Sequence, residues 1–407
     1  NSDLFFTAEE NKETYRKLAL AHTNVTYGEV QSLHGHDAFL MEFQQLEKLL
    51  EPVFNRTKKG EQPKILKFGG KSLANGKGLE HVLDLIRERS KAKENIVVVL
   101  SARGKATDEL EKMLKSASEG ADFEADFNRF KLYQQADFDQ VDLLQDFEGI
   151  LRILEGVSLT RDFSAKIKDE LLSYGELISG KMVCSLLNSF GTKAQLLDSR
   201  ALIKTDDAFN NAKVDESQSK ENVMRNFKNL DPEVVPVVTG FIASNSKGAT
   251  TTLGRNGTNY TAALLANFLD ARELVNYTHV DGIFTADPNL VPEAKRIDSI
   301  SYEEANELAN FGAHILHAKT IVPLIEKNIP LRIRNTFNPK SPGTRIEVNP
   351  GNGGIKSLSV QEDAALIYLE GRGLLGKVGI DARIFRVLGQ NQINVGIISQ
   401  GSSERGI

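Results

Sequence analysis

Apolar and polar positions alternate in a way that predicts a long α/β region in the middle of the chain. Apolar or β-branched runs occur at residues 65–66, 95–100, 193–197, 234–241, 273–277 and 331–334. Between them, side chains recur at helical spacing, as at Leu79, Val82, Leu83 and Ile86. Strands that are apolar on both faces and separated by helices indicate a mostly parallel sheet covered on both sides. Residues 119–172 are rich in Asp, Phe and Leu at helical spacing, so we expect a helical insertion beside a cleft, with its acidic residues solvated.

The pattern changes twice along the chain, which predicts three regions. Residues 55–63 are polar, lack periodicity and end in a proline, as linkers do. We therefore expect domains at 1–54, 64–350 and 351–407, the last following a Pro-Gly-Asn-Gly-Gly run. Residues 1–54 predict an extended stretch at 25–30 and then an amphipathic helix with the stripe Phe39, Phe43, Leu46, Leu50 and Val53.

Composition narrows the class of protein without naming a function. A chain of 407 residues with 40% hydrophobic and 26% charged residues is typical of a soluble globular protein of two or three domains. A net charge of −5 gives no reason to expect nucleic acid or a membrane as a partner. The single cysteine, Cys184, lies among Val183, Leu186 and Leu187 and is expected to be a core residue of a cytoplasmic protein. The chain starts without methionine and stops within a continuing pattern, so we expect a piece of a longer polypeptide.

The stretch Lys-Phe-Gly-Gly-Lys-Ser at 67–72 is a candidate phosphate site. Two glycines after a short strand let the backbone approach an anion, and a helix start just beyond them would direct N–H groups at it. A Walker A loop is excluded, because Ile65 stands where that motif requires glycine. Taken alone, the stretch could equally be an ordinary strand-to-helix connection.

Three further loops and one helix carry chemistry where ligands of parallel sheets bind. Hydroxyl-rich, glycine-rich or acidic turns occupy 101–108, 248–260 and 278–288. A helix places Glu176 between apolar neighbours, which is costly unless the carboxylate meets a cation or donors. Any one of these could be turn chemistry. Together they favour a binding site.

Residues 65–355 resemble the catalytic domain of aspartate kinases, in the amino-acid kinase family. The matching motifs lie at 67–72, 101–107, 175–177, 251–255, 280–288 and 311–317. The resemblance implies a three-layer αβα sandwich and transfer of the γ-phosphoryl group of ATP, with Mg²⁺, to the β-carboxylate of L-aspartate. The product would be 4-phospho-L-aspartate, in the biosynthesis of lysine, threonine and methionine.

The resemblance also assigns roles to residues, though none as a direct metal ligand. It implies Lys67, Arg255 and Asn259 as catalytic residues, with Lys67 on the transferring phosphoryl group and Arg255 on a substrate carboxylate. Substrate would be bound by Glu176, through the α-ammonium, and by Ser101, Thr107, Thr252, Thr258 and Arg255. Nucleotide would be bound by Lys67, Gly69, Gly70, Ser72, Thr278, His279, Asp281, Asp287 and His314.

Five positions depart from the family pattern close to the chemistry. Asn259 and His279 replace aspartates, Asn289 replaces an arginine, His314 stands where a lysine is common, and Lys71 where threonine or serine is usual. We favour an active kinase because Lys67, Arg255, Glu176 and Asp281 remain. A slower enzyme, a pseudo-kinase that senses an effector, and a kinase for another small acid such as glutamate stay open.

Residues 351–407 resemble the start of an ACT domain, a ferredoxin-like α+β regulatory module. The predicted elements are a strand at 364–369, a helix with Ile380, Ile384, Phe385 and Leu388 on one face, and a strand at 393–399. The resemblance implies pairing between subunits in a homo-oligomer and binding of a feedback amino acid, threonine or lysine. The candidate contacts are Gly371, Gly373, Gly376 and Asn394. The sequence of this region is most similar to that of bifunctional aspartate kinase/homoserine dehydrogenases, although no nicotinamide-binding fingerprint lies in this chain.

The N-terminal region resembles the end of homoserine O-acetyltransferases, which are α/β-hydrolases. Ser-Asp-Leu at 2–4 and Gly-His-Asp-Ala-Phe-Leu at 35–40 match their last two triad motifs, with Asp3 orienting His36. The chain has no Gly-x-Ser-x-Gly elbow, so we expect this α/β-hydrolase fragment to be catalytically silent. His34 and His36 could suggest a metal site, but no third ligand supports one.

Overall fold

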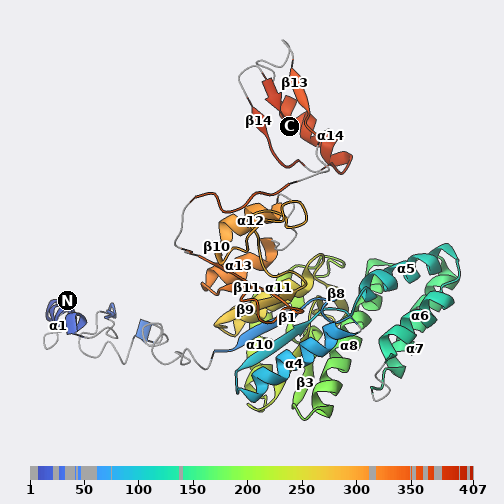
Figure 1. The fold of residues 1–407 in the computed structure, drawn as a ribbon, viewed down its shortest axis with the longest axis horizontal. Coiled ribbons are helices and arrows are strands. Elements are labelled where there is room, and N and C mark those ends of the chain that lie inside the picture. Colours follow the sequence, from blue (N-terminus) through green and yellow to red (C-terminus); the bar gives the residue numbers. More distant parts are fainter. Residues whose placement is uncertain are drawn as a thin grey trace. The chain divides into compact units, whose positions relative to one another are not determined.

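The computed structural model divides into two compact units, Asn1–Gln62 and Pro63–Ile407. It describes residues 8–21, 27–32, 42, 45–46, 62–74, 76–136, 141–310, 318–348, 350, 354–360, 365–370, 378–393, 395–400 and 404–406. Figure 1 shows their fold. Among these residues, no helix combines the length and apolar character needed to cross a bilayer.

The first unit contains a helix that the apolar pattern did not predict. Helix α1 (Ala8–Ala21) is polar over most of its length, so it lacks the stripe that would have marked it. Lys12 pairs with Glu29 at 2.5 Å, and the rings of Tyr15 and Tyr27 lie 5.7 Å apart. Residues 27–30, from the predicted extended stretch, form no strand. Most of the predicted amphipathic helix lies outside the described residues.

The second unit is organised around an eight-stranded sheet. Figure 1 shows helices packed around its strands. Its strands are β1 (Lys64–Phe68), β2 (Ile96–Leu100), β3 (Ala194–Leu197), β6 (Val235–Thr239), β9 (Glu273–Thr278), β10 (Ser299–Ser301), β11 (Leu331–Asn335) and β12 (Thr344–Glu347). Their order is β10-β12-β11-β9-β1-β2-β6-β3, and every pair except β11–β12 is parallel. The predicted mostly parallel sheet is confirmed.

Successive residues of the central strands feed two separate cores, so the fold has three layers. Leu66 and Phe68 of β1 pack on one face with α4 (Lys77–Lys91), α5 (Ala106–Glu119) and α8 (Ala165–Ser189). Ile65 packs on the other face, with α11 (Gly257–Phe268) and α13 (Ala318–Glu326). This second face also receives α10 (Glu216–Lys228), the short helix α9 (Ser199–Leu202) and α12 (Tyr302–Asn310). Alternation along a strand produces this division.

The predicted helical insertion is present as α6 (Glu124–Gln135) and α7 (Leu144–Thr160). Phe147 packs edge-on against Phe127 and Phe130, with ring centroids 6.5 Å apart in each pair. The expectation that all its acidic residues are solvated is wrong for Asp146, which is buried and ion-paired to Lys181 at 2.6 Å. Pairing is what makes such burial tolerable.

A second, four-stranded sheet was not predicted. It has the order β5-β4-β7-β8 and contains β4 (Lys204–Thr205), β5 (Val214–Asp215), β7 (Ile242–Asn245) and β8 (Thr250–Thr252). The run expected as one strand at 234–241 ends at Thr239, because the chain turns through Gly240 and Phe241, whose φ is 66°. The β7–β8 hairpin that follows is short and polar, so no apolar run reveals it.

The C-terminal region forms a small sheet and a helix. Strands β13 (Tyr368–Glu370), β15 (Glu404–Gly406) and β14 (Ser399–Gln400) pair antiparallel in that order, and α14 spans Ile380–Gln390. The helix was predicted within these bounds. Both expected strands are shorter than predicted, since residues 365–367 and 395–398 are not in strands.

Candidate active site

The glycine turn after β1 interlocks with the loop after β2. The Gly104 N–H donates to the Gly70 carbonyl at 3.0 Å. A Cβ at Gly70 would lie 2.7 Å from the Gly104 carbonyl oxygen and 2.8 Å from that of Ala102. Only glycine fits this approach, so the two loops form one rigid edge at the carboxyl ends of β1 and β2.

The expected helix start directly after the glycines is wrong. The N–H groups of Ser72 and Leu73 close a turn onto Gly69 and Gly70, and α4 begins only at Lys77. Ser72 itself is buried, and its hydroxyl shares a 2.7 Å hydrogen bond with Thr336. An anion at this turn would therefore meet the glycine backbone rather than a helix N-terminus.

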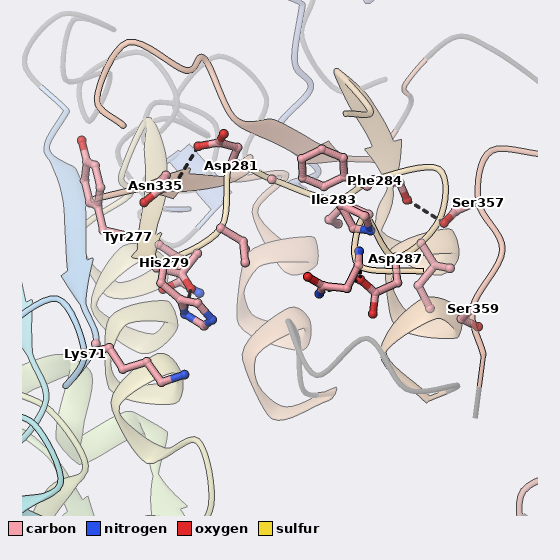
Figure 2. Close-up of a pocket in the computed structure, with 18 of the residues that line it drawn as sticks. Lys71, Tyr277, His279, Asp281, Ile283, Phe284, Asp287, Asn335, Ser357 and Ser359 are labelled. Atoms are coloured by element: carbon pink, nitrogen blue, oxygen red, sulfur yellow. Dashed lines mark hydrogen bonds between the residues drawn. The ribbon is translucent and has the colours of Figure 1, made fainter. Parts of the chain in front are cut away.

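A pocket of about 740 Å³ opens beside this turn (Figure 2). Eight of the nine residues predicted to bind nucleotide line it: Lys67, Gly69, Gly70, Ser72, Thr278, His279, Asp281 and Asp287. Lys71, Asn259 and Asn276 line it as well. The loop after β9 thus lies against the glycine turn, as expected from adjacent parallel strands.

Two carboxylates of this pocket are held by hydrogen bonds, and a histidine beside them has a lowered pKa. The Asp281 carboxylate accepts hydrogen bonds from Asn335 at 2.8 Å and Asn338 at 3.2 Å. Asp287 accepts from the Asn289 backbone at 2.8 Å. Burial, and then the nearby Lys71 ammonium, lower the pKa of His279, so this imidazole favours its neutral form.

One wall of the pocket comes from a segment that carries no motif. Residues 357–360, which follow the sheet, line the pocket opposite the glycine turn. The Ser357 hydroxyl donates to the Phe284 carbonyl at 2.7 Å (Figure 2). The Leu358 N–H donates to the Thr285 carbonyl at 2.9 Å. Lys356 pairs with Glu304 at 2.8 Å. Only the tertiary fold brings this segment to the site, so sequence reasoning had no signal for it.

A second pocket, of about 650 Å³, lies on the other side of Lys67. All the residues predicted to bind substrate line it: Ser101, Thr107, Glu176, Thr252, Arg255 and Thr258. Arg255 is exposed, and within the described residues its guanidinium has neither an ion pair nor a hydrogen bond. It is therefore free to bind a carboxylate with both arms.

Glu176 lies on α8 at the base of this pocket, and its carboxyl group is only half satisfied. Oε1 accepts the Ala102 N–H at 3.1 Å, whereas Oε2 is buried and has no partner in the part of the chain that the structure describes. Burial raises the pKa of Glu176 to about 8. An acidic group in this state is prepared to receive a cation.

Thr252 is fixed to α8 by a buried carboxylate. Asp169 accepts the Thr252 N–H at 2.9 Å and its hydroxyl at 2.8 Å, as well as the Asn210 N–H at 2.8 Å. Because this hydroxyl is already engaged, Thr252 presents less hydrogen-bonding capacity to the pocket than its predicted role assumed.

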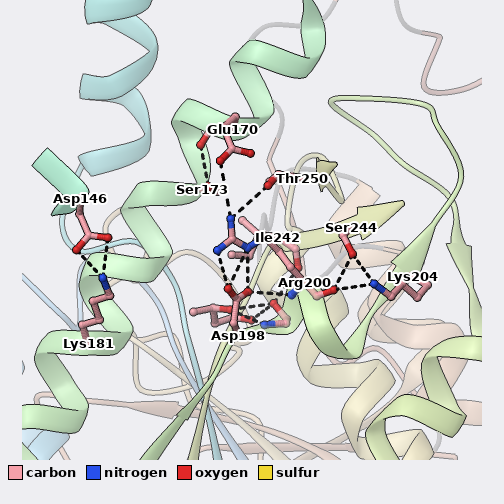
Figure 3. Close-up of polar contacts among 12 residues, drawn as sticks. Asp146, Glu170, Ser173, Lys181, Asp198, Arg200, Lys204, Ile242, Ser244 and Thr250 are labelled. Atoms are coloured by element: carbon pink, nitrogen blue, oxygen red, sulfur yellow. Dashed lines mark hydrogen bonds and ion pairs between the residues drawn. The ribbon is translucent and has the colours of Figure 1, made fainter. Parts of the chain in front are cut away.

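Strand β8, which ends at Thr252, is also held at its first residue, Thr250, by an ion-pair network that Figure 3 shows. Arg200 donates to Asp198 at 2.7 Å and to the Thr250 hydroxyl at 3.3 Å, and lies 3.9 Å from Glu170 of α8. Lys204 donates to Ser244 at 2.7 Å. Helix α8 and the second sheet together therefore support strand β8 and the loop after it, which carries Arg255.

The two pockets share three residues: Lys67, Gly70 and Asn259. Lys67 is the last polar position of β1, and burial lowers its pKa to about 8. Asn259 lies in the first turn of α11, after Gly254 and Asn256 with φ of 75° and 61°. A group passing from one pocket to the other would pass these residues.

Several predicted residues lie outside the described residues. They are His314 of the nucleotide set, the effector candidates Gly371, Gly373, Gly376 and Asn394, and the acyltransferase pair Asp3 and His36.

The residues present are compatible with a magnesium ion carried by nucleotide phosphates. Within the described part of the chain, no group of three His, Cys, Asp or Glu side chains could hold a metal. Mg²⁺ commonly binds through one or two carboxylates and substrate phosphates, and Asp281 and Asp287 face the first pocket.

Comparison with known families matches two parts of the chain. The model described as "Amino acid kinase family" matches residues 62–335, and one described as "ACT domain" matches 367–407. The first covers more than half of the chain. The chain belongs to the amino acid kinase family.

Relatives within the family are aspartokinases, alone or fused to a dehydrogenase. The chain is 31% identical to the bifunctional aspartokinase/homoserine dehydrogenase 2 of Zea mays over 86% of this chain and 40% of that protein. It is 32% identical to the lysine-sensitive aspartokinase 3 of Escherichia coli, over 82% of this chain and 75% of that one. This amino acid kinase chain thus spans about two fifths of the length of the bifunctional relatives.

Solved structures of E. coli aspartokinase III share the fold. The complex with lysine and aspartate, in the T-state, gives a TM-score of 0.73 at 31% identity, covering 84% of this chain and 78% of that one. The complex with aspartate and ADP, in the R-state, gives 0.72 at 30% identity, covering 85% and 78%. The α/β amino acid kinase fold with an ACT domain is therefore established for this chain.

Proposed function

We propose that this chain is an aspartate kinase, which transfers the γ-phosphoryl group of ATP to the β-carboxylate of L-aspartate and gives 4-phospho-L-aspartate and ADP. The observation that carries the proposal is the junction of two pockets at Lys67, Gly70 and Asn259. The first pocket contains the Gly69–Gly70 turn, which suits a phosphate group. The second contains Arg255, whose guanidinium is unpaired among the described residues, and Glu176, whose carboxyl group makes one hydrogen bond there. Two anionic substrates, one in each pocket, would meet at this junction beside the Lys67 ammonium group.

The reaction needs positioning and charge neutralisation more than acid–base chemistry. A β-carboxylate oxygen attacks the γ-phosphorus and forms the new P–O bond, while the bond from that phosphorus to the β,γ-bridging oxygen breaks and ADP departs with the electron pair. No proton has to move. The protonated Lys67 would neutralise charge on the transferring group, and binding of the phosphates would favour that protonated form.

Roles in the second pocket follow from charge. Arg255 would bind an aspartate carboxylate through two parallel hydrogen bonds. Glu176 would lose its proton and take the α-ammonium at its unpartnered Oε2. Ser101, Thr107, Thr252 and Thr258 would supply neutral contacts around them.

In the first pocket, the Gly69 and Gly70 backbone would hold the phosphates, and the loop carrying Thr278, His279, Asp281 and Asp287 would cover the nucleotide. Ser72 would stabilise the turn through Thr336. We include His314 in this set on the family pattern alone. Mg²⁺ would arrive with the nucleotide, with Asp281 and Asp287 within its pocket, and would neutralise phosphate charge there. The E. coli structure with aspartate and ADP supports this pair of ligands.

A substrate panel tests the proposal. ADP release would be measured from ATP with L-aspartate, L-glutamate or neither, using the complete polypeptide. Turnover that requires L-aspartate is expected. Turnover with glutamate instead would favour a kinase for another acid, and ligand binding without any turnover would favour an effector-sensing pseudo-kinase.

We also propose that the C-terminal ACT region binds a feedback amino acid, threonine or lysine, and joins subunits into a homo-oligomer. The ACT match and the lysine in the E. coli T-state complex support this. Contacts would come from Gly371, Gly373, Gly376 and Asn394. Inhibition by lysine or threonine of the wild-type enzyme, lost on Asn394→Ala, is the expected outcome.

For the other regions we propose the boundaries 1–54, 55–63, 64–350 and 351–407. The first would be an acetyltransferase-like α/β-hydrolase remnant, supported only by the motifs around Asp3 and His36. A lack of acetyl transfer to homoserine by the purified chain is expected.

A further inference from the structure

One polar pair interrupts an otherwise apolar row across the central sheet. Lys67 of β1 is directly opposite Asn276 of β9 in the parallel register. On the far side of Lys67 lies Val99 of β2, and on the far side of Asn276 lies Ile333 of β11. Both flanking residues belong to the core beneath α11. Paired residues of neighbouring strands share a face, so Lys67 and Asn276 are directed toward α11 as well.

Neighbouring positions confirm this assignment of faces. Leu66 and Val275 are paired and belong to the opposite core, and Phe68 and Tyr277 are paired and stack with ring centroids 4.7 Å apart. Lys67 and Asn276 therefore alternate to the α11 face, where the first turn of α11 carries Asn259. All three side chains line the first pocket.

Asn276 has an oxygen that no described group satisfies. Its side chain is 9% exposed, and Oδ1 is buried with no hydrogen-bond partner. Two other amides of the pocket are engaged: Asn335 donates to Asp281 and Asn289 to Asp287. A buried amide oxygen left without a donor is destabilising, whereas a branched apolar residue would suit the row. The oxygen can still accept a hydrogen bond from a donor that approaches it in another state of the site.

The donor best placed to be that partner is the Lys67 ammonium. Lys67 makes no hydrogen bond or ion pair within the described residues, and burial lowers the pKa of its ammonium group. We propose that Asn276 positions Lys67 for phosphoryl transfer by accepting a hydrogen bond from its ammonium group when the nucleotide is bound. This inference rests on the proposed catalytic role of Lys67.

An amide in this place has a different effect from a carboxylate. It orients the ammonium group through one hydrogen bond and leaves its full charge available to the phosphoryl group. A carboxylate would orient the ammonium and also neutralise it. With Asn259 on the other side, this chain would surround its central lysine with neutral acceptors.

The test replaces Asn276 in the complete polypeptide in two ways. Asn276→Leu removes the acceptor and keeps the volume, and Asn276→Asp keeps the acceptor and adds charge. Ser179→Ala is the matched control, because Ser179 also carries a buried unpartnered oxygen but lies outside both pockets. The pH dependence of Lys67 acetylation by acetic anhydride, measured with ADP bound and followed by mass spectrometry, reports the titration of Lys67 in the nucleotide-bound state without requiring turnover.

We expect Asn276→Leu to lower the midpoint of Lys67 titration and to reduce kcat about tenfold or more, with the KM for aspartate little changed. Asn276→Asp should raise the midpoint and retain more turnover than Asn276→Leu. Ser179→Ala should leave the midpoint and kcat at the wild-type values. A merely structural Asn276 would move thermal stability but none of these quantities.

The proposal is overturned if the Asn276→Leu variant has the same midpoint of Lys67 titration and the same kcat as the wild type. If the wild type itself shows no aspartate-dependent turnover, the proposed function fails, and the acetylation profile alone still decides the role of Asn276. If Asn276→Leu does not fold, Asn276→Asp decides: an unchanged midpoint overturns the proposal, and a raised one supports it.

Discussion

Asp169 on α8 and Thr252 on β8 are joined by two buried hydrogen bonds, one to the Thr252 N–H at 2.9 Å and one to its hydroxyl at 2.8 Å. The same carboxylate also accepts the Asn210 N–H. Arg255 lies three residues after Thr252, in the loop that follows β8. Its position therefore depends on Asp169, a residue that does not line either pocket.

Replacing Asp169 should therefore weaken aspartate binding from a distance. Asp169→Ala leaves two backbone N–H groups and a hydroxyl without an acceptor, which should cost about 3 kcal/mol of unfolding free energy. We expect a raised KM for aspartate and a smaller change in the KM for ATP. Thr252→Ser keeps both hydrogen bonds and is the control. Equal effects on the two KM values would contradict this account.

Glu176 should make stability depend on pH. Its pKa is raised from 4.5 to about 8 in the folded chain, so the folded state holds a proton that the unfolded state releases between those values. The contribution of Glu176 is fully present below about 4.5 and is lost as pH rises toward about 8. Lys67 does not make stability depend on pH below about 8, because its ammonium group is protonated in both the folded and the unfolded chain there.

Glu176→Gln tests this directly. The variant should gain stability relative to the wild type as pH is raised from 5 to 8 in thermal unfolding. A stability difference that is the same at both pH values would show that Glu176 is already ionised in the folded protein.

Aspartate binding should release a proton near pH 7. The incoming α-ammonium would favour the ionised form of Glu176, whose pKa would then fall from about 8. Calorimetric titration in phosphate and in Tris buffer should give binding enthalpies that differ by the buffers' ionisation enthalpies. The difference should vanish in Glu176→Gln, and an identical wild-type enthalpy in both buffers would refute the prediction.

Gly70→Ala should damage the phosphate turn. The added Cβ meets two backbone carbonyl oxygens at 2.7 and 2.8 Å, so the loops after β1 and β2 must separate. We expect a loss of about 1–3 kcal/mol in stability and weaker ATP binding. Gly156→Ala is the matched control: nothing lies within 4 Å of its Cβ position in α7, and the change should stabilise by up to about 1 kcal/mol. Unimpaired ATP binding by Gly70→Ala would argue against a phosphate role.

The sequence predicts the central sheet because its strands are apolar on both faces, as at 96–100. It also predicts eight residues that line the first pocket and six that line the second, because most of them cluster at strand ends in recognisable motifs. Prediction from the sequence fails for single polar residues inside apolar runs, for short polar strands, and for contacts between residues that are far apart in the sequence. Asn276 is hidden within an apolar run, residues 357–360 reach the pocket only through tertiary contacts, and the Thr250–Thr252 strand has no apolar signature.

The position of α4 shows the same limit. The apolar repeat from Leu79 to Ile86 marks the helix correctly, but it cannot locate the first turn. The chain closes a separate turn over Gly69 and Gly70 before the helix begins at Lys77.

The most direct test of the central claim is ATP turnover by the wild type and by Lys67→Ala, with ADP release measured with and without L-aspartate. We expect aspartate-dependent turnover in the wild type and a loss of about 100-fold or more in Lys67→Ala, because one preorganised charge on the transferring group is removed. ATP binding by Lys67→Ala should remain measurable by calorimetry, which shows that the pocket persists. Binding of both substrates by the wild type without turnover, or undiminished turnover in Lys67→Ala, would contradict the assignment of Lys67 as the catalytic lysine of an aspartate kinase.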